Sequence, residues 1–353
     1  MVFDLAPVQS PAAVHMVRDA ASGLDGLIVL HSTALGPAAG GCRFWHYASA
    51  GDMAADALRL AEGMSYKNAL ADLPFGGGKA VLRRPSGRFD RRALFEAFGR
   101  AVEALGGGYV TAEDVGTGID DMRAVAQATR HVAGLPAIGG WPGGDPSPWT
   151  ALGVFLSMEV AVERRLGRPL SDCSVAIQGV GQVGAALAMM LHGIGAKLVI
   201  ADVDAANAAR VAAATGAMVA PASAILSFKA DVLAPCALGG VLNARTIPTL
   251  HAKVVCGAAN NQLGTREDGA LLADRGVLYA PDYVVNAGGI INVAAEHLRW
   301  SAEVARDRVE ATGARLARVL DLAERSGQAT NLAAENLARA TIASRAADLK
   351  HVA

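Results

Sequence analysis

Apolar residues along the chain follow two periods, and together they predict an α/β protein. Residues 52–70 and 91–105 carry apolar side chains at helical spacing, which predicts two amphipathic helices. Short apolar runs at residues 27–32, 79–82 and 108–111 predict strands. The first third of the chain therefore combines strands and helices.

Beyond residue 173 the elements alternate more regularly. Residues 184–191 and 302–350 have helical patterns. Strands are predicted at residues 174–178, 197–201, 232–233, 254–256 and 278–279. Strands that alternate with helices are typical of a doubly wound α/β domain with a parallel sheet.

One proline- and glycine-rich run, residues 139–148, is the strongest interruption of this pattern. Since 353 residues are enough for two domains of ordinary size, we expect a domain boundary there. The predicted domains are residues 1–147 and residues 148–324. The last helical residues, 325–353, are expected to pack back on the first domain.

Composition narrows the function classes. A formal net charge of −1 without a basic tract argues against nucleic acid or an anionic membrane as a partner. No apolar segment reaches the ~20 residues of a membrane span, and the first residues lack the pattern of a secretory signal. Four widely spaced cysteines are typical of reduced thiols in a cytoplasmic protein. The eight histidines show no metal-ligand spacing, so no metal site is expected.

A dinucleotide-binding motif lies between an apolar strand and an alanine-rich helix. It consists of Gly179, Val180, Gly181, Gln182, Val183 and Gly184. In this motif the first glycine allows a tight turn, the second lets the backbone approach a pyrophosphate, and the third lets the helix pack on the strand. The alternative is a glycine-rich turn that binds nothing.

An acidic residue follows the motif at the expected distance. Asp202 ends the next predicted strand, 18 residues after Gly184. A carboxylate there accepts hydrogen bonds from the ribose hydroxyls and repels a 2′-phosphate, so the cofactor is predicted to be NAD rather than NADP. Asp204 is close enough to share or compete for this role.

The first domain has an unusual run at residues 73–79, in which three consecutive glycines precede Lys79. Glycine backbone lets a ligand approach closely, so we expect a bare turn with the lysine pointing toward the ligand. Lys67 ends the helix before it, and Asp114 follows the strand after it. Two lysines and an aspartate suit a substrate with a carboxylate and a reacting polar centre. The alternative is a surface turn with a solvated lysine.

Seven segments between about Ser32 and Val293 resemble those of the dehydrogenases that act on glutamate, leucine, valine and phenylalanine. They are LGPAAGG at residues 35–41, MSYKNA at 64–69, GGGK at 76–79, TAEDVGT at 111–117, APCALGG at 234–240, GAANNQL at 257–263 and APDYVVNAGG at 280–289. The leucine and valine enzymes resemble the chain most, and the phenylalanine enzymes follow.

The resemblance implies an NAD-dependent enzyme for the reversible oxidative deamination of an L-amino acid to a 2-oxo acid and ammonium. It implies a substrate domain with a mixed sheet, a Rossmann domain, and an active-site cleft between them. Lys67 and Asn286 would bind the α-carboxylate, beside the backbone of Gly40 and Gly41.

The resemblance also assigns the catalytic groups. Lys79 would activate the water that attacks the iminium, and Asp114 would exchange protons with the amine. The chemistry agrees, because hydration of an iminium needs a base that is partly neutral near the working pH. Asp114 must stay ionised, and we expect the two neighbouring lysines to lower its pKa.

At the nicotinamide end, the resemblance implies that Thr150 holds the carboxamide. The residues that would border the nicotinamide ribose are Ala234, Pro235, Cys236, Ala259, Asn260 and Asn261. Members of the family assemble through the substrate domain, so a homo-oligomer, a dimer or larger, is expected.

Substrate choice rests on three pocket positions implied by the resemblance. Glutamate enzymes carry a lysine where this chain has Ala39, so a buried glutamate carboxylate would lack its partner and glutamate is excluded. Ala112 and Ile290 resemble the aliphatic-substrate enzymes, and Phe75 would edge the pocket. Because Ala39 enlarges the pocket and Ile290 restricts it, leucine, valine and isoleucine are favoured, with phenylalanine as the alternative.

Two other classes predict a different sequence. A non-catalytic NAD-binding protein is expected to lack Lys79 or Asp114, and both are present. A 2-hydroxy acid dehydrogenase would use a histidine relay with an arginine, and none of the eight histidines falls in a glycine-turn segment.

Overall fold

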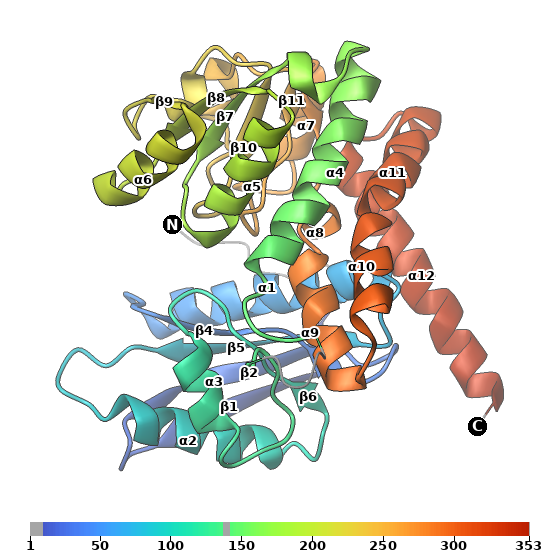
Figure 1. Ribbon diagram of the computed structural model, residues 1–353. Coiled ribbons are helices and arrows are strands. Elements are labelled where there is room, and N and C mark those ends of the chain that lie inside the picture. Colours follow the sequence, from blue (N-terminus) through green and yellow to red (C-terminus); the bar gives the residue numbers. More distant parts are fainter. Residues whose placement is uncertain (1–9, 137–141, 353) are drawn as a thin grey trace. The chain divides into compact units, whose positions relative to one another are not determined.

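The computed structural model describes residues 10–136 and 142–352 of the chain. The chain divides into two compact units (Figure 1). Unit 1 is made of Met1–Asp145, Asn292–Ala305 and Ala338–Ala353, and unit 2 of Pro146–Ile291 and Arg306–Leu337.

The chain passes from unit 1 to unit 2 between residues 145 and 146, close to the predicted boundary. Its later crossings from one unit to the other differ from the predicted ones. Residues 292–305 belong to unit 1, and of the segment 325–353 only residues 338–353 do. Each later crossing falls inside a helix, namely α9 (Gly288–Leu298), α10 (Ala302–Glu310) or α12 (Thr330–Val352). Helical periodicity gives no sign of where such a helix changes units. Residues 139–141 of the proline- and glycine-rich run lie outside the described residues.

Unit 1 is built on a mixed sheet with the order β1-β2-β5-β3-β6, in which β4 also pairs with β5. β1–β2 and β2–β5 are antiparallel, and the other pairs are parallel. The strands are β1 (Ala13–Asp19), β2 (Leu24–Ser32), β3 (Ala38–Ala39), β4 (Cys42–Trp45), β5 (Gly76–Arg83) and β6 (Tyr109–Val110).

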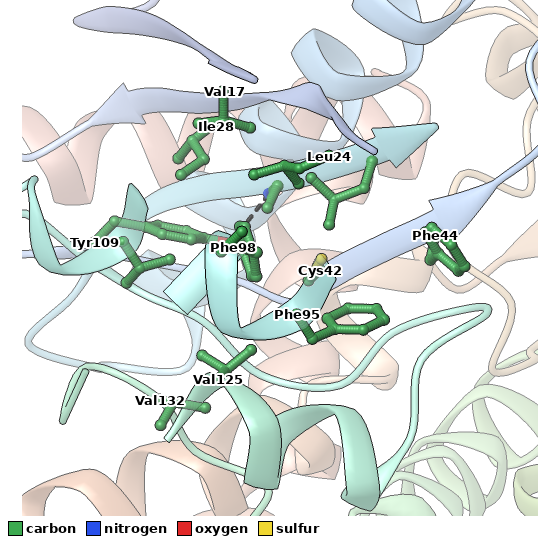
Figure 2. Packing of buried hydrophobic residues seen from close by; sticks show 14 of the residues in the cluster. Val17, Leu24, Ile28, Cys42, Phe44, Phe95, Phe98, Tyr109, Val125 and Val132 are labelled. Carbon is green, nitrogen blue, oxygen red and sulfur yellow. Dashed lines mark hydrogen bonds between the residues drawn. The ribbon is translucent and has the colours of Figure 1, made fainter. Parts of the chain in front are cut away.

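Helices cover both faces of this sheet (Figure 1). On one face, α1 (Ala50–Leu70) packs Met53 and Leu60 against Val29 and Val81. The other face carries α2 (Arg91–Glu103) and α3 (Ile119–Val125). Figure 2 shows the core beneath them, which includes Ile28, Cys42, Phe44, Phe95, Phe98 and Tyr109. Because successive strand residues point to opposite faces, Ile28 and Val29 enter different cores.

The three glycines predicted as a bare turn are instead the first residues of β5. None of the three has a positive φ. A Cβ on Gly77 would lie 2.0 Å from the backbone nitrogen of Ser65, and one on Gly76 would lie 1.9 Å from the carbonyl oxygen of Ser32. Close packing of α1 and of the end of β2 therefore requires glycine here, and the predicted approach of a ligand to bare backbone is wrong for these positions.

Unit 2 is a parallel sheet with the order β12-β11-β10-β7-β8-β9. In chain order this is 3-2-1-4-5-6 read from β9, the arrangement of a Rossmann domain. The strands are β7 (Ser174–Gln178), β8 (Lys197–Ala201), β9 (Met218–Val219), β10 (Val232–Pro235), β11 (Val254–Val255) and β12 (Leu278–Tyr279). The order reverses between β7 and β10, so their carboxyl ends border the crevice where such domains bind ligands.

The helices of unit 2 are α4 (Ser147–Leu166), α5 (Gln182–Gly193), α6 (Ala205–Thr215), α7 (Asp268–Asp274), α8 (Asp282–Val285) and α11 (Thr312–Ser326), with parts of α9, α10 and α12. Three short 3₁₀ turns, η1 (Leu170–Asp172), η2 (Ile225–Ser227) and η3 (Ile247–Thr249), complete the unit. One of its cores includes Ala176, Val199, Leu233 and Val255 from the central strands. The predicted α/β fold is confirmed.

Candidate active site

A buried ion pair lies at the centre of unit 1. Strand β5 holds Lys79, and the loop after β6 holds Asp114. The Lys79 Nζ lies 2.9 Å from the Asp114 Oδ2, and the two side chains are only 4% and 10% exposed. The structure therefore brings together the two residues that the sequence proposed as catalytic, and the alternative of a solvated Lys79 is wrong.

A third charged residue, Arg43 on β4, was not predicted. Its Nε donates to the same Asp114 oxygen at 3.1 Å. Its Nη1 donates to both carboxylate oxygens of Asp56, at 3.2 and 3.0 Å. The Tyr47 Oη in turn donates to the Asp56 Oδ2. An arginine inside the apolar run 42–45 was the available signal, but its partners come from α1 and from the loop after β6.

The charge balance favours an ionised Asp114. Burial raises the pKa of Asp114, but the charges of and hydrogen bonds from Lys79 and Arg43 outweigh it and hold that pKa well below its usual range. The sequence predicted this direction but named two lysines as the cause. The second cation at the carboxylate is Arg43.

Backbone packing fixes the loop that holds Gly40 and Gly41. A Cβ on Gly40 would lie 1.9 Å from the carbonyl oxygen of Gly78, and one on Gly41 would lie 2.4 Å from that of Glu113. The Tyr109 Oη donates to the Gly40 carbonyl at 2.6 Å and accepts from the Ala80 nitrogen at 3.0 Å. Tyr109 thus joins this loop to β5 beside Lys79, a role that sequence reasoning missed.

The end of α1 is fixed in a similar way. Lys67 is buried in its last turn. The neighbouring Asn68 donates from Nδ2 to the carbonyl oxygens of Gly76 and Ala39, at 2.6 and 3.3 Å. Ala39 and Ala112, the two predicted pocket positions of unit 1, are both buried. The lysine and Ala39 are therefore positioned by elements that pack on the same strand, β5.

In unit 2 the three motif glycines have the three predicted environments. Gly179 has a φ of +87°, as a tight turn requires. A Cβ on Gly184 would lie 2.0 Å from the Gly179 carbonyl oxygen, so only glycine allows α5 to start this close to the turn. A Cβ on Gly181 would meet nothing within 4 Å. The open side at Gly181 is where a pyrophosphate could approach the backbone.

The start of α5 suits an anion. Its N-cap is Gly181, followed by Gln182 and Val183, so no N-cap side chain bonds the first amide groups. The Asp202 Oδ2 accepts from the Val180 nitrogen at 2.7 Å, which fixes the carboxylate beside the loop. The Asp204 Oδ1 instead accepts from the Ala206 nitrogen at 2.9 Å and caps α6. These residues fit the phosphates and the adenine-side ribose of a dinucleotide.

Further candidate cofactor residues lie at the carboxyl ends of β10 and β11. Ala234 and Pro235 are buried in β10, and Cys236 follows them. The Ala259 nitrogen donates to the Pro235 carbonyl at 2.9 Å. The Gly184 Cβ position is 3.3 Å from the Cys236 Cβ, so this strand end adjoins the glycine motif. Asn261 has a φ of +51°, and its nitrogen donates to the Asp282 Oδ2 at 2.8 Å.

Asn286, after α8, presents an oxygen rather than an N–H group. Its Nδ2 donates to the Ala258 carbonyl and to the Asn260 Oδ1, both at 3.0 Å. Its Oδ1 is buried and has no hydrogen-bond partner within residues 10–136 and 142–352. A free acceptor suits an ammonium or hydroxyl donor of a ligand. The predicted bond to an α-carboxylate would need Nδ2 to release one of its partners.

Two remaining candidates lie at the starts of α4 and α9. The Thr150 Oγ1 donates to the Pro146 carbonyl at 3.1 Å and lies 2.8 Å from the Cβ position of Gly289. Ile290 follows in α9 and is buried. Thr150, Asn286 and Ile290 thus belong to unit 2, whereas Lys67, Lys79 and Asp114 belong to unit 1.

Two kinds of feature are absent from the part of the chain that the structure describes. No group of histidine, cysteine, aspartate or glutamate in that part of the chain could hold a metal ion. No helix there is both long and apolar enough to cross a membrane.

Comparison with known proteins assigns both halves of the chain to one family. Residues 8–131 match the Glu/Leu/Phe/Val dehydrogenase dimerisation domain, and residues 200–348 match the Glutamate/Leucine/Phenylalanine/Valine dehydrogenase domain. Leucine dehydrogenase from Thermoactinomyces intermedius is 43% identical over 97% of this chain and 93% of its own length. Valine dehydrogenase from Streptomyces albus is 50% identical over 80% of this chain and 79% of its own.

A solved structure extends the similarity to the fold. The crystal structure of L-tryptophan dehydrogenase from Nostoc punctiforme has a TM-score of 0.78 at 39% identity, covering 95% of this chain and 96% of that one. The chain therefore belongs to the Glu/Leu/Phe/Val dehydrogenase family of amino-acid dehydrogenases, oxidoreductases that depend on a nicotinamide cofactor.

Proposed function

We propose that the protein catalyses the NAD-dependent, reversible oxidative deamination of a hydrophobic L-amino acid to its 2-oxo acid and ammonium. The observation that carries the proposal is the buried pair of Lys79 and Asp114, with 2.9 Å between Nζ and Oδ2. A lysine and an ionised carboxylate side by side can exchange protons with a water and with an amine.

The substrate would be held by its α-carboxylate and its amine. The Lys67 ammonium would supply a positive charge for the carboxylate, and the backbone of Gly40 and Gly41 would line the same spot. The free Oδ1 of Asn286 accepts from a donor on the ligand. Fixed contacts at both groups restrict the orientation of Cα, which lowers the entropic part of the barrier.

A bound NAD would supply the acceptor for the hydride from Cα. The protein's own residues handle the protons. Lys79 in its neutral form takes a proton from the water that attacks the iminium carbon, and Asp114 exchanges a proton with the amine nitrogen. Asp114 suits this role because Lys79 and Arg43 hold its pKa below the usual range, so that it is ionised at the working pH.

The cofactor is proposed to be NAD rather than NADP. Asp202 is fixed by the Val180 nitrogen at the end of β8, where its charge would repel a 2′-phosphate. The phosphates would bind at Gly181, Gln182 and Val183, at the start of α5. Thr150 and the residues after β10 and β11 would border the nicotinamide half.

For the substrate we favour leucine, valine and isoleucine. Ala39 carries no charge for a distal carboxylate, and Ala112 and Ile290 are apolar and buried. The similar leucine and valine dehydrogenases support this choice. Aromatic amino acids, phenylalanine above all, are the second candidate, because the small Ala39 leaves room and one similar structure is a tryptophan dehydrogenase.

We also propose a cytoplasmic homo-oligomer that assembles through unit 1. The family match covering this unit is described as a dimerisation domain. β1 is an edge strand, and Val14 and Met16 on it are exposed. An edge strand with apolar side chains is a ready surface for a second copy of the chain.

The test of the function is a panel of initial rates with NAD at alkaline pH. The panel consists of leucine, valine, isoleucine, phenylalanine, tryptophan and glutamate. We expect the highest kcat/KM for a branched-chain substrate and none for glutamate. Preference for an aromatic substrate would select the second candidate, and no NAD reduction with any of the six would refute the proposal.

A further inference from the structure

Arg43 occupies a distinctive position next to the proposed catalytic carboxylate. It lies between two acidic residues, with Nε on Asp114 and Nη1 on Asp56. The Tyr47 Oη on the Asp56 Oδ2 extends this row of contacts. The row thus runs from Lys79 through Asp114, Arg43 and Asp56 to Tyr47, and the exposed fraction of the side chains rises from 4% at Lys79 to 26% at Asp56.

Arg43 and Lys79 share one oxygen of Asp114. Both donate to Oδ2, at 3.1 and 2.9 Å. The two cations therefore fix the carboxylate by the same oxygen.

Three titratable groups near Asp114 carry no charge, whereas Glu113, its neighbour in the chain, is ionised above about pH 7. Burial raises the pKa of Cys42 on β4, of Tyr47 after it and of Tyr109 on β6, so all three are neutral at working pH. Asp56 on α1 is paired with Arg43 itself. Lys79 and Arg43 are the positive charges that lower the pKa of Asp114 most.

These two cations differ in one chemical property. A lysine that acts as a base must lose its charge during turnover, whereas a guanidinium stays protonated throughout. When Lys79 is neutral, Arg43 is the remaining cation at the buried carboxylate. Its charge then opposes the effect of burial, which favours a protonated Asp114.

We propose that Arg43 is a positioning residue that holds Asp114 ionised and fixed by Oδ2 while Lys79 is neutral, and that Asp56 and Tyr47 hold Arg43 in place. This inference rests on the proposed function and deepens it. Arg43 acts through Asp114 and has no contact with substrate in this role.

The test is the pH dependence of kcat/KM for amino-acid oxidation in Arg43→Met. A nearby positive charge favours the deprotonated form of Asp114, on which activity depends in this proposal. Its removal should move the acid limb of the profile to higher pH by at least about one unit, a tenfold loss at fixed pH below the limb. The rate should recover partly as the pH rises.

Matched variants separate charge from structure. Arg43→Lys keeps the positive charge but cannot contact both Asp114 and Asp56. We expect its acid limb to lie within about 0.5 pH units of that of the unaltered enzyme, while its kcat stays lowered. Tyr47→Phe, which keeps every charge but loses the hydrogen bond to Asp56, should shift the limb in the same direction by less, and it carries the test if Arg43→Met does not fold. Arg92→Met, which loses only a surface pair with Glu96, is the control.

NADH binding, measured by fluorescence titration, should stay within about twofold in each variant. A uniform loss of rate at all pH values, with the limb unmoved, would overturn the inference and leave Arg43 a structural role. If the unaltered protein reduces no NAD with any amino acid, the proposed function fails instead. The two failures are therefore distinguishable.

Discussion

The Lys79 Nζ and the Asp114 Oδ2 form a buried ion pair, 2.9 Å apart, between a strand and a loop that are 35 residues apart in the chain. Arg43 also contacts Asp114, so one carboxylate faces two cations, of which Arg43 is paired with Asp56 as well. Loss of a single partner from such a cluster leaves charge that burial does not tolerate.

Replacing Asp114 by asparagine should therefore cost both stability and activity. With Lys79 and Arg43 left facing each other, we expect the free energy of unfolding to fall by about 3–5 kcal/mol. Urea denaturation measures this change. kcat should fall by at least about a hundredfold, because an amide cannot take a proton from the amine.

The control for this variant is Asp120→Asn. Asp120 pairs with Arg123, but its side chain is 90% exposed. A surface pair contributes less than about 1 kcal/mol, so stability and kcat should hardly change. Equal free energies of unfolding for Asp114→Asn and Asp120→Asn would show that the ion pair of Asp114 does not stabilise the fold.

Gly181→Ala separates cofactor binding from folding. A Cβ at this position meets nothing within 4 Å, and its φ of −65° suits any residue. The free energy of unfolding should change by less than about 0.5 kcal/mol. The affinity for NADH, measured by fluorescence titration, should fall at least about tenfold because the methyl group blocks the approach of the pyrophosphate.

Gly184→Ala should behave in the opposite way. Its Cβ would clash with the Gly179 carbonyl at 2.0 Å, so the free energy of unfolding should fall before the affinity for NADH does.

Unchanged NADH affinity in Gly181→Ala would contradict the first of these two predictions, because it would mean that the phosphates bind elsewhere.

Asp202→Asn tests the choice of cofactor. Removing the charge removes the repulsion of a 2′-phosphate, so the ratio of kcat/KM for NAD to that for NADP should fall at least about tenfold. Asp204→Asn is the comparison, since Asp204 caps α6 and should leave the ratio unchanged. A preference for NADP in the unaltered protein would contradict the role given to Asp202.

Glu113, next to Asp114, predicts a pH dependence of stability. Burial, then the charges of Asp145, Asp121 and Glu296, raise the pKa of Glu113 to about 7. In the unfolded chain a glutamate has a pKa of about 4.3. The native protein thus keeps a proton that the unfolded chain has lost, so this contribution to stability is complete below about pH 4 and disappears as the pH rises through 7.

Urea denaturation between pH 4.5 and 8 checks this sign. Glu113→Gln keeps a neutral group at every pH, so its free energy of unfolding should fall less than that of the unaltered protein over this range. Parallel curves for the two proteins would show that Glu113 does not hold the proton.

How much of the molecule could be predicted depended on how local each feature is. The Rossmann half follows from a continuous strand–turn–helix–strand segment, so the tight turn at Gly179 and the close packing at Gly184 could be predicted, while the role of Asp202 toward a ribose stays a prediction. The family resemblance and the two-unit α/β fold were also confirmed. Both predictions rest on continuous segments of the chain, since the motifs that resemble the family are long and specific.

The features that were missed depend on distant pairings. Arg43 reaches Asp114 because β4 pairs with β5 beside Lys79, and Tyr109 reaches Gly40 because β6 lies beside β3. β3 and β6 have two residues each and show no period of their own. The glycines of β5 were predicted as a turn because glycine disfavours strands, whereas close packing of α1 against the strand requires them.

The most direct test of the account measures NADH oxidation with the 2-oxo acid of leucine, with and without ammonium, in the unaltered protein and in Lys79→Ala. We predict oxidation that requires ammonium in the unaltered protein, and a kcat at least about a hundredfold lower in the variant. NADH binding should survive in the variant. Oxidation without ammonium, or a variant kcat within about tenfold of the unaltered value, would contradict the assignment of Lys79 as the base of an amino-acid dehydrogenase.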